Sequence, residues 1–249
     1  LDLLDNCVDG CVRTGKTTSA TKDKPYAGYS ASININKDYF EIIDNCGGIE
    51  KDLAQNYAFR FGRKDSDRDK GLHTVGVYGI GMKRAIFKLG TECTIISNHK
   101  NSGFSIKIDE NWINDDDNWL LDMEEHDSKE PRGTSIRVNR LHNSISIAFD
   151  EEKNNFATNL RQRLQKHYSL IIDKGFKVTI NNVEVKAKKL QTMLDPRAFE
   201  NERGISPQIY ETDYDGVKIR LIFGLYEKLP SDQDVEDIEN GNRTKEDAG

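Results

Sequence analysis

Residues 29–44 constrain the fold more than any other part of the sequence. Apolar and polar residues alternate up to Lys37, so that Ile33 and Ile35 point to the same side, which is typical of a strand with one buried face. Asp38 is a turn residue, and the apolar run at 39–43 predicts a second, buried strand. The segment therefore predicts an antiparallel β-hairpin that ends at a carboxylate.

The other periodic segments alternate irregularly between helix and strand patterns. Several strand pairs are joined by short turns, which predicts an α+β fold with a mixed, mostly antiparallel sheet and helices on one face. The acidic, tryptophan-containing segment 111–125 is expected to pack at an edge of the sheet. Helices are expected at 1–12, 50–59, 82–89 and 151–173, and strands at 92–97, 104–108, 134–139, 176–180, 183–185 and 217–225.

Composition narrows the class of protein. The chain has 249 residues and a net charge of −6, with the charged and apolar content of a folded globular protein. No segment approaches the ~18 apolar residues of a membrane span, and the bulk charge does not favour nucleic acid. The four cysteines lack a zinc-like spacing, so we expect them to be reduced and buried. Together with the missing signal-peptide pattern, this indicates a cytoplasmic protein.

Three polar residues share one face of the first expected helix. Asp2, Asn6 and Asp9 follow the spacing i, i+4 and i+7. Oxygen ligands of this kind suit Mg²⁺ with its waters, and a carboxylate beside the ion could orient or deprotonate an attacking water. An ordinary solvated helix face is the alternative. The opposite, apolar side is expected to consist of Leu1, Leu4 and Val8.

The hairpin ends in a second polar motif, Asp44-Asn45-Cys46-Gly47-Gly48. The Asp44 carboxylate can accept a hydrogen bond from an exocyclic amine such as that of adenine. The two glycines would let the backbone approach a flat ring, because no Cβ stands in the way. An ordinary turn has the same composition, so the motif by itself leaves both interpretations open.

A glycine-rich loop precedes the helix expected at 82–89. Gly76, Gly79 and Gly81 leave backbone amides free to wrap phosphates at a helix N-terminus, and Lys83 lies in the first turn, within reach of a terminal phosphate. The loop also resembles a dinucleotide-binding fingerprint, but a polar loop and not a strand comes before it. Further on, Thr134 at a strand start could hydrogen-bond a base.

A competing motif lies at residues 10–17, Gly-Cys-Val-Arg-Thr-Gly-Lys-Thr, which satisfies the P-loop pattern letter for letter. A P-loop requires a buried strand before it and a helix after it. Here an amphipathic helix is expected before the motif, and a polar loop without apolar periodicity follows it. We therefore interpret the match as a coincidence of loop composition.

Taken in order, these motifs resemble the GHKL ATPases, which include gyrase B, the 90-kilodalton heat-shock chaperones, MutL, MORC proteins and histidine kinases. Residues 2–10 are similar to the N-box, usually Glu-x-x-x-Asn-x-x-Asp-Ala, and residues 44–48 to the Asp-x-Gly-x-Gly box. Residues 76–83 are similar to the lid glycine box, and residues 133–134 to the late Gly-Thr element. The region after 140 looks most like uncharacterised bacterial and MORC-like members.

The resemblance implies a Bergerat-type α/β sandwich with ATP between the sheet and the helices. It implies that Asn6 ligates Mg²⁺, Asp44 binds the adenine amine, and Gly48 lies under the base. The ATP-binding residues expected from it are Asn6, Asp9, Asp44, Gly48, Gly76, Gly79, Gly81, Met82, Lys83 and Thr134.

Two residues depart from the family pattern. Asp2 stands where the family usually has a glutamate general base, and the shorter side chain is expected to slow hydrolysis. Cys46 replaces the first glycine of its box, and we expect ligand binding to tolerate this small side chain. The resemblance therefore implies Mg-ATP binding with slow hydrolysis at Asp2. The alternatives are a nucleotide-binding module with little or no hydrolysis and a histidine-kinase-type phosphotransferase.

The resemblance also implies an organisation and partners. Residues 1–140 would form the ATP-binding core, 141–229 would complete or extend it, and 230–249 would be an acidic linker or the start of a following domain. Both ends are expected to be cuts in a longer protein. ATP would close a lid at 60–81 and drive homodimerisation or docking of downstream domains. A protein or DNA partner bound through missing domains is left open, and no membrane partner is expected.

Overall fold

A computed structural model describes residues 1–55, 59, 81–100, 102–115, 121–188 and 208–223. The chain divides into two compact units, Leu1–Ala187 and Lys188–Gly249. In the part of the chain that is described, no helix is long and apolar enough to cross a membrane.

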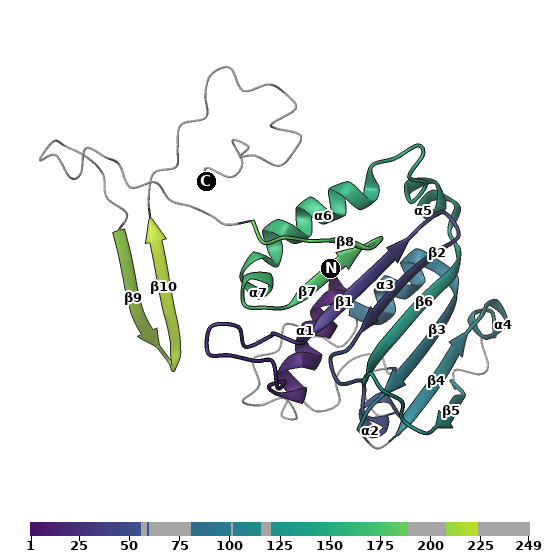
Figure 1. Ribbon diagram of the computed structural model, residues 1–249. Helices are drawn as coiled ribbons and strands as arrows, with labels where there is room; N and C mark the ends of the chain where they lie inside the picture. The colour runs from purple at the N-terminus through teal and green to yellow at the C-terminus, as the bar shows by residue number, and fades with distance from the viewer. Residues whose placement is uncertain (56–58, 60–80, 101, 116–120, 189–207, 224–249) are drawn as a thin grey trace, which may run out of the picture. The chain divides into compact units, whose positions relative to one another are not determined.

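The first unit contains an eight-stranded sheet in the order β5-β4-β3-β6-β2-β1-β7-β8 (Figure 1). All neighbouring strands are antiparallel except β1 and β7, which are parallel. The prediction of a mixed, mostly antiparallel sheet is therefore confirmed. The strands are β1 (Ser30–Ile35), β2 (Tyr39–Asp44), β3 (Gly90–Asn98), β4 (Gly103–Ile108), β5 (Met123–His126), β6 (Gly133–Leu141), β7 (Lys177–Ile180) and β8 (Val183–Glu184).

The hairpin that the sequence predicts is β1 and β2. Ile33 pairs with Ile42, and Ala31 pairs with Asp44, so the Asp44 carboxylate stands at the end of β2. The other edge of β2 pairs with β6, which places the hairpin in the middle of the sheet. The sequence predicts a buried strand here, but β2 is buried on one face only: Phe40 and Ile42 are buried, whereas Ile43 is 41% exposed.

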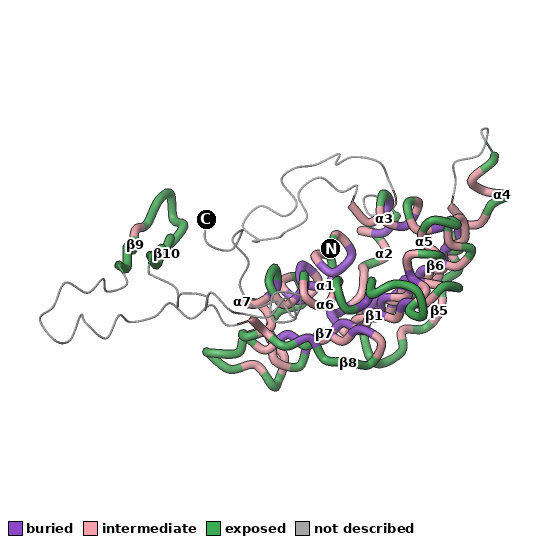
Figure 2. Tube along the Cα trace, turned by 90° about the horizontal axis from the view of Figure 1, so that it is seen from above, coloured by how far each residue is buried: buried purple, intermediate pink, exposed green. Residues whose placement is uncertain are grey.

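Helices lie on one side of the sheet. Figure 2 shows α1, α3 and α6 on the same side of the strands. The alternation of each strand sends its buried residues to this side, where Ile33, Ile42 and Val138 are at most 4% exposed. The helices are α1 (Asp2–Thr14), α2 (Lys51–Leu53), α3 (Gly81–Leu89), α4 (Glu110–Ile113), α5 (Asn143–Ala148), α6 (Phe156–His167) and α7 (Ser169–Asp173).

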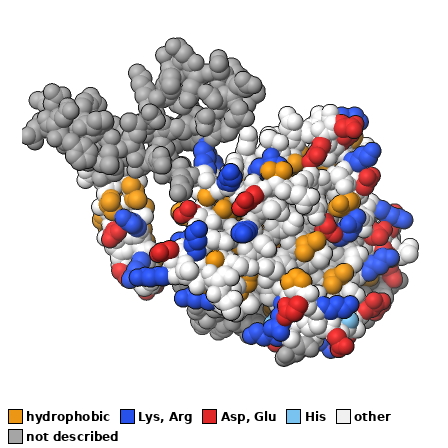
Figure 3. Space-filling model, in the orientation of Figure 1, with side chains coloured by type: hydrophobic (Ala, Val, Ile, Leu, Met, Phe, Trp, Pro, Cys, Tyr) orange, Lys and Arg blue, Asp and Glu red, His pale blue; other side chains and the backbone are white. Residues whose placement is uncertain are grey.

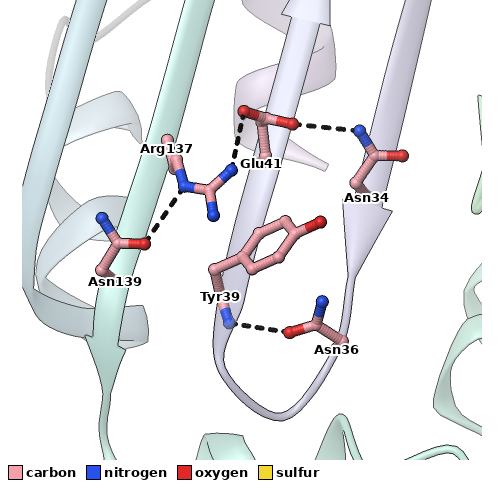
Figure 4. A network of polar contacts seen from close by, with 6 residues as sticks. All are labelled: Asn34, Asn36, Tyr39, Glu41, Arg137 and Asn139. Carbon is pink, nitrogen blue, oxygen red and sulfur yellow. Dashed lines mark hydrogen bonds and ion pairs between the residues drawn. The ribbon is translucent and has the colours of Figure 1, made fainter.

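The opposite face of the sheet is polar. Arg137 of β6 donates a hydrogen bond to Glu41 of β2 at 3.3 Å, and its guanidinium lies 3.8 Å from the centre of the Tyr39 ring (Figure 4). Asn34 of β1 donates to the same carboxylate at 3.1 Å. Acidic and basic side chains are interspersed across the visible face of the first unit (Figure 3). Face-by-face segregation of this kind fixes the register, because a one-residue slip would bury these polar groups.

Several expected elements differ from the observed ones. The single helix expected at 151–173 is two helices, which begin at Phe156 and break at Tyr168. The Tyr168 hydroxyl donates to the backbone oxygen of Leu1 at 3.3 Å and to the Asp5 carboxylate, so a tertiary contact fixes the break. Gly90 begins β3 and does not cap α3. Of the helix expected at 50–59, the described part forms α2 and one further turn.

The second unit contains one described hairpin, β9 (Gln208–Tyr214) with β10 (Val217–Phe223). The strand expected at 217–225 is confirmed as β10, whereas β9 was not predicted. Asp215 and Gly216 both have positive φ, 52° and 77°, as a two-residue hairpin turn requires. This Asp-Gly pair is the sequence signal that would have identified β9. The linker expected at 230–249 lies outside the described residues.

Candidate functional site

The ends of three neighbouring strands bring Asp44, Thr134 and Ser97 together. Thr134 of β6 pairs with Ser97 of β3, and the Thr134 amide donates to Asp44 Oδ1 at 3.3 Å. The Cys46 amide donates to the same oxygen at 2.7 Å. Asp44 Oδ1 is therefore held by two backbone groups, which fixes the carboxylate where these central strands end.

The second oxygen of this carboxylate is held less tightly. Asp44 Oδ2 accepts a hydrogen bond from the Cys7 thiol of α1 at 3.5 Å, and thiols are weak donors. The side chain remains partly exposed. Desolvation by burial raises the pKa of Asp44, and the backbone hydrogen bonds from Cys46 and Thr134 oppose that rise in part. Oδ2 is thus the oxygen that can accept a hydrogen bond from a bound amine.

This raised pKa predicts a pH-dependent affinity for a ligand that donates to Asp44. The ionised carboxylate is the acceptor, so affinity should be constant well above the raised pKa and should fall as the pH drops through it. Below that pKa the loss should approach about tenfold per pH unit. The contribution of Asp44 to the free energy of unfolding changes in the opposite direction. Because the pKa of Asp44 is higher in the folded than in the unfolded state, this contribution is most favourable at low pH and decreases as the pH rises through the folded-state pKa.

Titration calorimetry with ATP across pH 4.5–8 on an about half-unit grid would measure this dependence. An affinity that stays constant across this whole range would contradict the effect of burial, because an ordinary aspartate titrates below it, at about 3.9. Asp44→Asn is the control, because its amide does not titrate.

The loop after β2 crosses onto the end of β3. The Gly47 amide donates to the Arg132 carbonyl at 3.2 Å, and the Ile49 amide donates to Ser97 Oγ at 2.7 Å. Gly48 has φ +72°, and a Cβ there would lie 2.2 Å from the Asn98 carbonyl oxygen. Glycine is therefore required at 48 both for its conformation and for the close approach of the two backbones.

The helix α1 packs closely against the loop after β2 at Gly10, where the N-box usually has alanine. A Cβ at Gly10 would lie 2.9 Å from the backbone carbonyl oxygen of Cys46 and 3.1 Å from its Cβ. The close approach of these two backbones therefore favours glycine at 10. The Cys11 thiol also donates to Cys46 Sγ at 3.2 Å. All four cysteines are free and buried, as expected.

The polar residues on one face of α1 differ in how deeply they are buried. Asn6 is exposed and Asp2 is partly exposed, whereas Asp9 is only 1% exposed. On the apolar side Leu4 and Val8 are buried as expected, but Leu1 is 49% exposed because it precedes the helix.

Asp2 lies against the first turn of α3. Arg84 Nη2 donates to Asp2 Oδ2 at 2.8 Å, and an added Cβ at Gly81 would lie 3.3 Å from Asp2 Cβ. The hydrogen bond from Arg84 is the main reason that the pKa of Asp2 is lowered. The structure thus places the expected catalytic residue beside the end of the expected lid.

Of the remaining residues of the glycine box, the structure describes some and not others. Met82 is partly buried on α3, and Lys83 is 5% exposed, where desolvation lowers its pKa. Lys83 lines a pocket together with Ile86, Phe87 and Trp112, among other apolar residues. Its contact with a phosphate stays a prediction. Gly76 and Gly79, with the rest of the expected lid before Gly81, lie outside the described residues.

Sequence reasoning missed Cys7, Ser97, Arg84 and Tyr168 as parts of this site. Arg84 directly follows Lys83 and lies about one helical turn after Gly81. This position next to the glycine box was the signal that could have identified it. The other three carry no local signal, because strand pairing or helix docking brings them in from distant positions. Tyr168 contacts Asp5 of α1 from the junction of α6 and α7.

The residues present fit a magnesium ion that arrives with a nucleotide. Among the described residues, no group of three or more His, Cys, Asp and Glu side chains could hold a metal by itself. Mg²⁺ is commonly held by one or two protein oxygens together with substrate phosphates and waters. An exposed amide oxygen at Asn6, on the same helix face as Asp2, is a donor of this kind.

The P-loop alternative fails on its structural context. Gly10 and Cys11 lie inside α1, so the residues directly before the motif form a helix and not a strand. Between Gly15 and Gly28 the chain forms turns and bends without a helix. The motif at 10–17 therefore lacks both elements that would cradle a phosphate.

A model of the family described as histidine kinase-, DNA gyrase B- and HSP90-like ATPases matches residues 1–146. The match covers more than half of the chain and contains the three strand ends and both helices of the site. The chain belongs to this family, the GHKL ATPases, whose shared domain binds ATP.

The fold is similar to that of the ATPase region of Saccharomyces cerevisiae topoisomerase II, whose structure was solved with ICRF-187 (dexrazoxane) bound. The match has a TM-score of 0.52 at 16% identity and covers 75% of this chain. It covers 48% of the topoisomerase chain, so this chain spans about half the length of that relative. A search of curated proteins found no match.

Proposed function

We propose that this protein binds Mg-ATP and hydrolyses it slowly, with Asp44 reading the adenine amine and Asp2 acting as the general base. The observation that carries the proposal is the Asp44 carboxylate, whose Oδ1 is fixed by two backbone amides while Oδ2 remains an acceptor. An acceptor fixed in this way favours a base with an exocyclic donor over one with an oxygen at the same position.

The proposed hydrolysis uses residues of α1. Mg²⁺, held by Asn6 and the phosphates, would supply charge neutralisation when it is bound. Asp2 orients a water and accepts its proton as the water oxygen bonds to the γ-phosphorus. The bond from that phosphorus to the bridging oxygen breaks, and ADP and phosphate leave. The remaining carboxylate oxygen, Asp2 Oδ1, is the one that can accept from water, because Arg84 engages Oδ2.

Lid closure and ATP-dependent dimerisation are further parts of the proposal. They rest on the position of Gly81 and α3, which lie directly against Asp2 and in contact with α1. A phosphate held by the first turn of α3 would order the segment before it, and that segment would then present a new surface to a second copy or a downstream domain.

A nucleotide-binding module with little hydrolysis is the second candidate. One observation favours it: Arg84 lowers the pKa of Asp2, and a more acidic carboxylate is a weaker proton acceptor. A histidine-kinase-type phosphotransferase stays an alternative; His167, among the described residues, is the last residue of α6.

Variants at Asp2 test the proposed hydrolysis. Asp2→Asn should lower kcat by about 10²–10⁴-fold while ATP affinity changes little, because an amide accepts no proton. Asp2→Glu should raise kcat above the wild-type value, because it restores the longer side chain of the family. Steady-state phosphate release gives kcat, and calorimetry gives the affinity.

Wild-type turnover in Asp2→Asn would remove Asp2 from the role of general base. Tight ATP binding by the wild type without phosphate release, together with hydrolysis by Asp2→Glu, would favour the non-hydrolysing module instead.

A further inference from the structure

The ion pair between Asp2 and Arg84 joins two elements that are far apart in sequence. Asp2 begins α1, and Arg84 lies in the first turn of α3, with 2.8 Å between Asp2 Oδ2 and Arg84 Nη2. The backbone at Gly81 also approaches Asp2 closely, so the two helices meet at this carboxylate. The pair therefore connects the proposed general base, Asp2, with the helix that follows the proposed lid.

An aspartate at this position needs an external constraint to act as a base. The Asp2 side chain is 36% exposed, so the packing around it does not hold it in a single conformation. A partly exposed carboxylate samples several rotamers, and a base displaced by about an ångström loses much of its effect. The guanidinium of Arg84 selects one of those rotamers, because it holds Oδ2 and leaves Oδ1 open.

We propose that Arg84 is a positioning residue that fixes the Asp2 carboxylate for water activation; this inference rests on the proposed function. Arg84 couples that position to α3, so the carboxylate is aimed only when the first turn of α3 is in place. The arrangement also offsets the shorter side chain of aspartate, because the general base is held by a second helix in addition to its own.

The electrostatic surroundings of Asp2 include more than Arg84. Burial and the nearby Asp5 raise the pKa of Tyr168 at the α6–α7 junction, and Asp2 contributes to the same rise. Arg84 is the group that contacts the carboxylate and the largest cause of its lowered pKa.

The pair contributes little to stability, which makes it testable. The Arg84 side chain is 58% exposed, and exposed ion pairs contribute about 0–1 kcal/mol. Variants at Arg84 should therefore fold normally, and their kinetic defects can be assigned to the position of Asp2. Lys88 on the same helix is exposed as well, so Lys88→Met is a matched control for the loss of one positive charge from α3.

The test compares Arg84→Met, Arg84→Lys and Lys88→Met. Arg84→Met should lower kcat about tenfold or more with less than about threefold change in ATP affinity, and Arg84→Lys should recover part of that loss. In Arg84→Met the acid limb of the pH–kcat profile should move to higher pH, because the pKa of Asp2 rises when the guanidinium is removed. Lys88→Met should behave as wild type. Carbon-13 NMR of labelled aspartate would follow the Asp2 carboxyl directly.

A double variant separates positioning from an independent role. In the Asp2→Asn background, Arg84→Met should cause little further loss of kcat, because the base that it positions is gone. An equal loss in both backgrounds, or unchanged kcat and pH profile in Arg84→Met, overturns the inference while the proposed function stands. ATP binding by the wild type without hydrolysis also overturns it, and absence of ATP binding overturns the proposed function itself.

Discussion

Replacing Asp44 with alanine is expected to weaken ATP binding by about 100-fold or more, below detection at micromolar protein. The variant removes the acceptor for the base amine, and a hydrogen bond to a charged group contributes about 1.5–3 kcal/mol. It also frees the amides of Cys46 and Thr134, which hold Oδ1 at 2.7 and 3.3 Å, so the loop that leads to Gly48 loses its anchor. Titration calorimetry with ATP measures the loss.

Asp38→Ala is the matched control for this experiment, because Asp38 is an exposed acid in the turn of the same hairpin. It removes the same charge from the other end of β2 and should leave ATP affinity unchanged. Circular dichroism and thermal unfolding would show that both variants keep the fold. Retained ATP affinity in Asp44→Ala would contradict the adenine site.

Gly48→Ala is expected to destabilise the fold strongly, although it adds a single methyl group. The residue has φ +72°, and the new Cβ would lie 2.2 Å from the Asn98 carbonyl oxygen and 2.6 Å from its carbonyl carbon, which are backbone atoms of β3. Backbone strain and overpacking each cost about 1–3 kcal/mol, so the free energy of unfolding should fall by about 2–6 kcal/mol. ATP binding should be lost with it.

The variant Gly15→Ala separates the effect of backbone strain from the effect of the steric clash. Gly15 has φ +91°, but a Cβ there would meet nothing within 4 Å, so the substitution introduces strain without a clash. It should cost about 1–2 kcal/mol and leave ATP affinity unchanged. Chemical denaturation of both variants measures the difference. Equal losses would mean that the approach to Asn98 does not constrain the loop, and that the loop can move away from β3.

The hairpin of β1 and β2 could be predicted because its determinants are local. Alternation, a turn residue and an apolar run specify two strands and place Asp44 at the end of the second one. The break between α6 and α7 could not be predicted, because the periodicity of the segment continues through Tyr168. What breaks it is a hydrogen bond to Leu1 and Asp5, which are more than 160 positions away.

The candidate site divides in the same way. Asp2, Asn6, Asp44 and Thr134 were recognisable because each lies in a short motif whose residue types suit the chemistry. The close packing of Gly10 against Cys46 was not, because the two residues lie in separate motifs. Only the tertiary structure shows that α1 and the loop after β2 approach each other at these residues.

The sequence by itself determined the family, the mixed sheet and the candidates that we propose for binding a base and activating water. These depend on residue type, spacing and periodicity, which are properties of neighbouring positions. The tertiary structure alone decided which oxygen of Asp44 two backbone amides hold, how deeply Asp9 and Lys83 are buried, and that Arg84 holds Asp2. Those features depend on which strand ends and helix turns meet in space, and contacts between distant segments leave no local pattern in the chain.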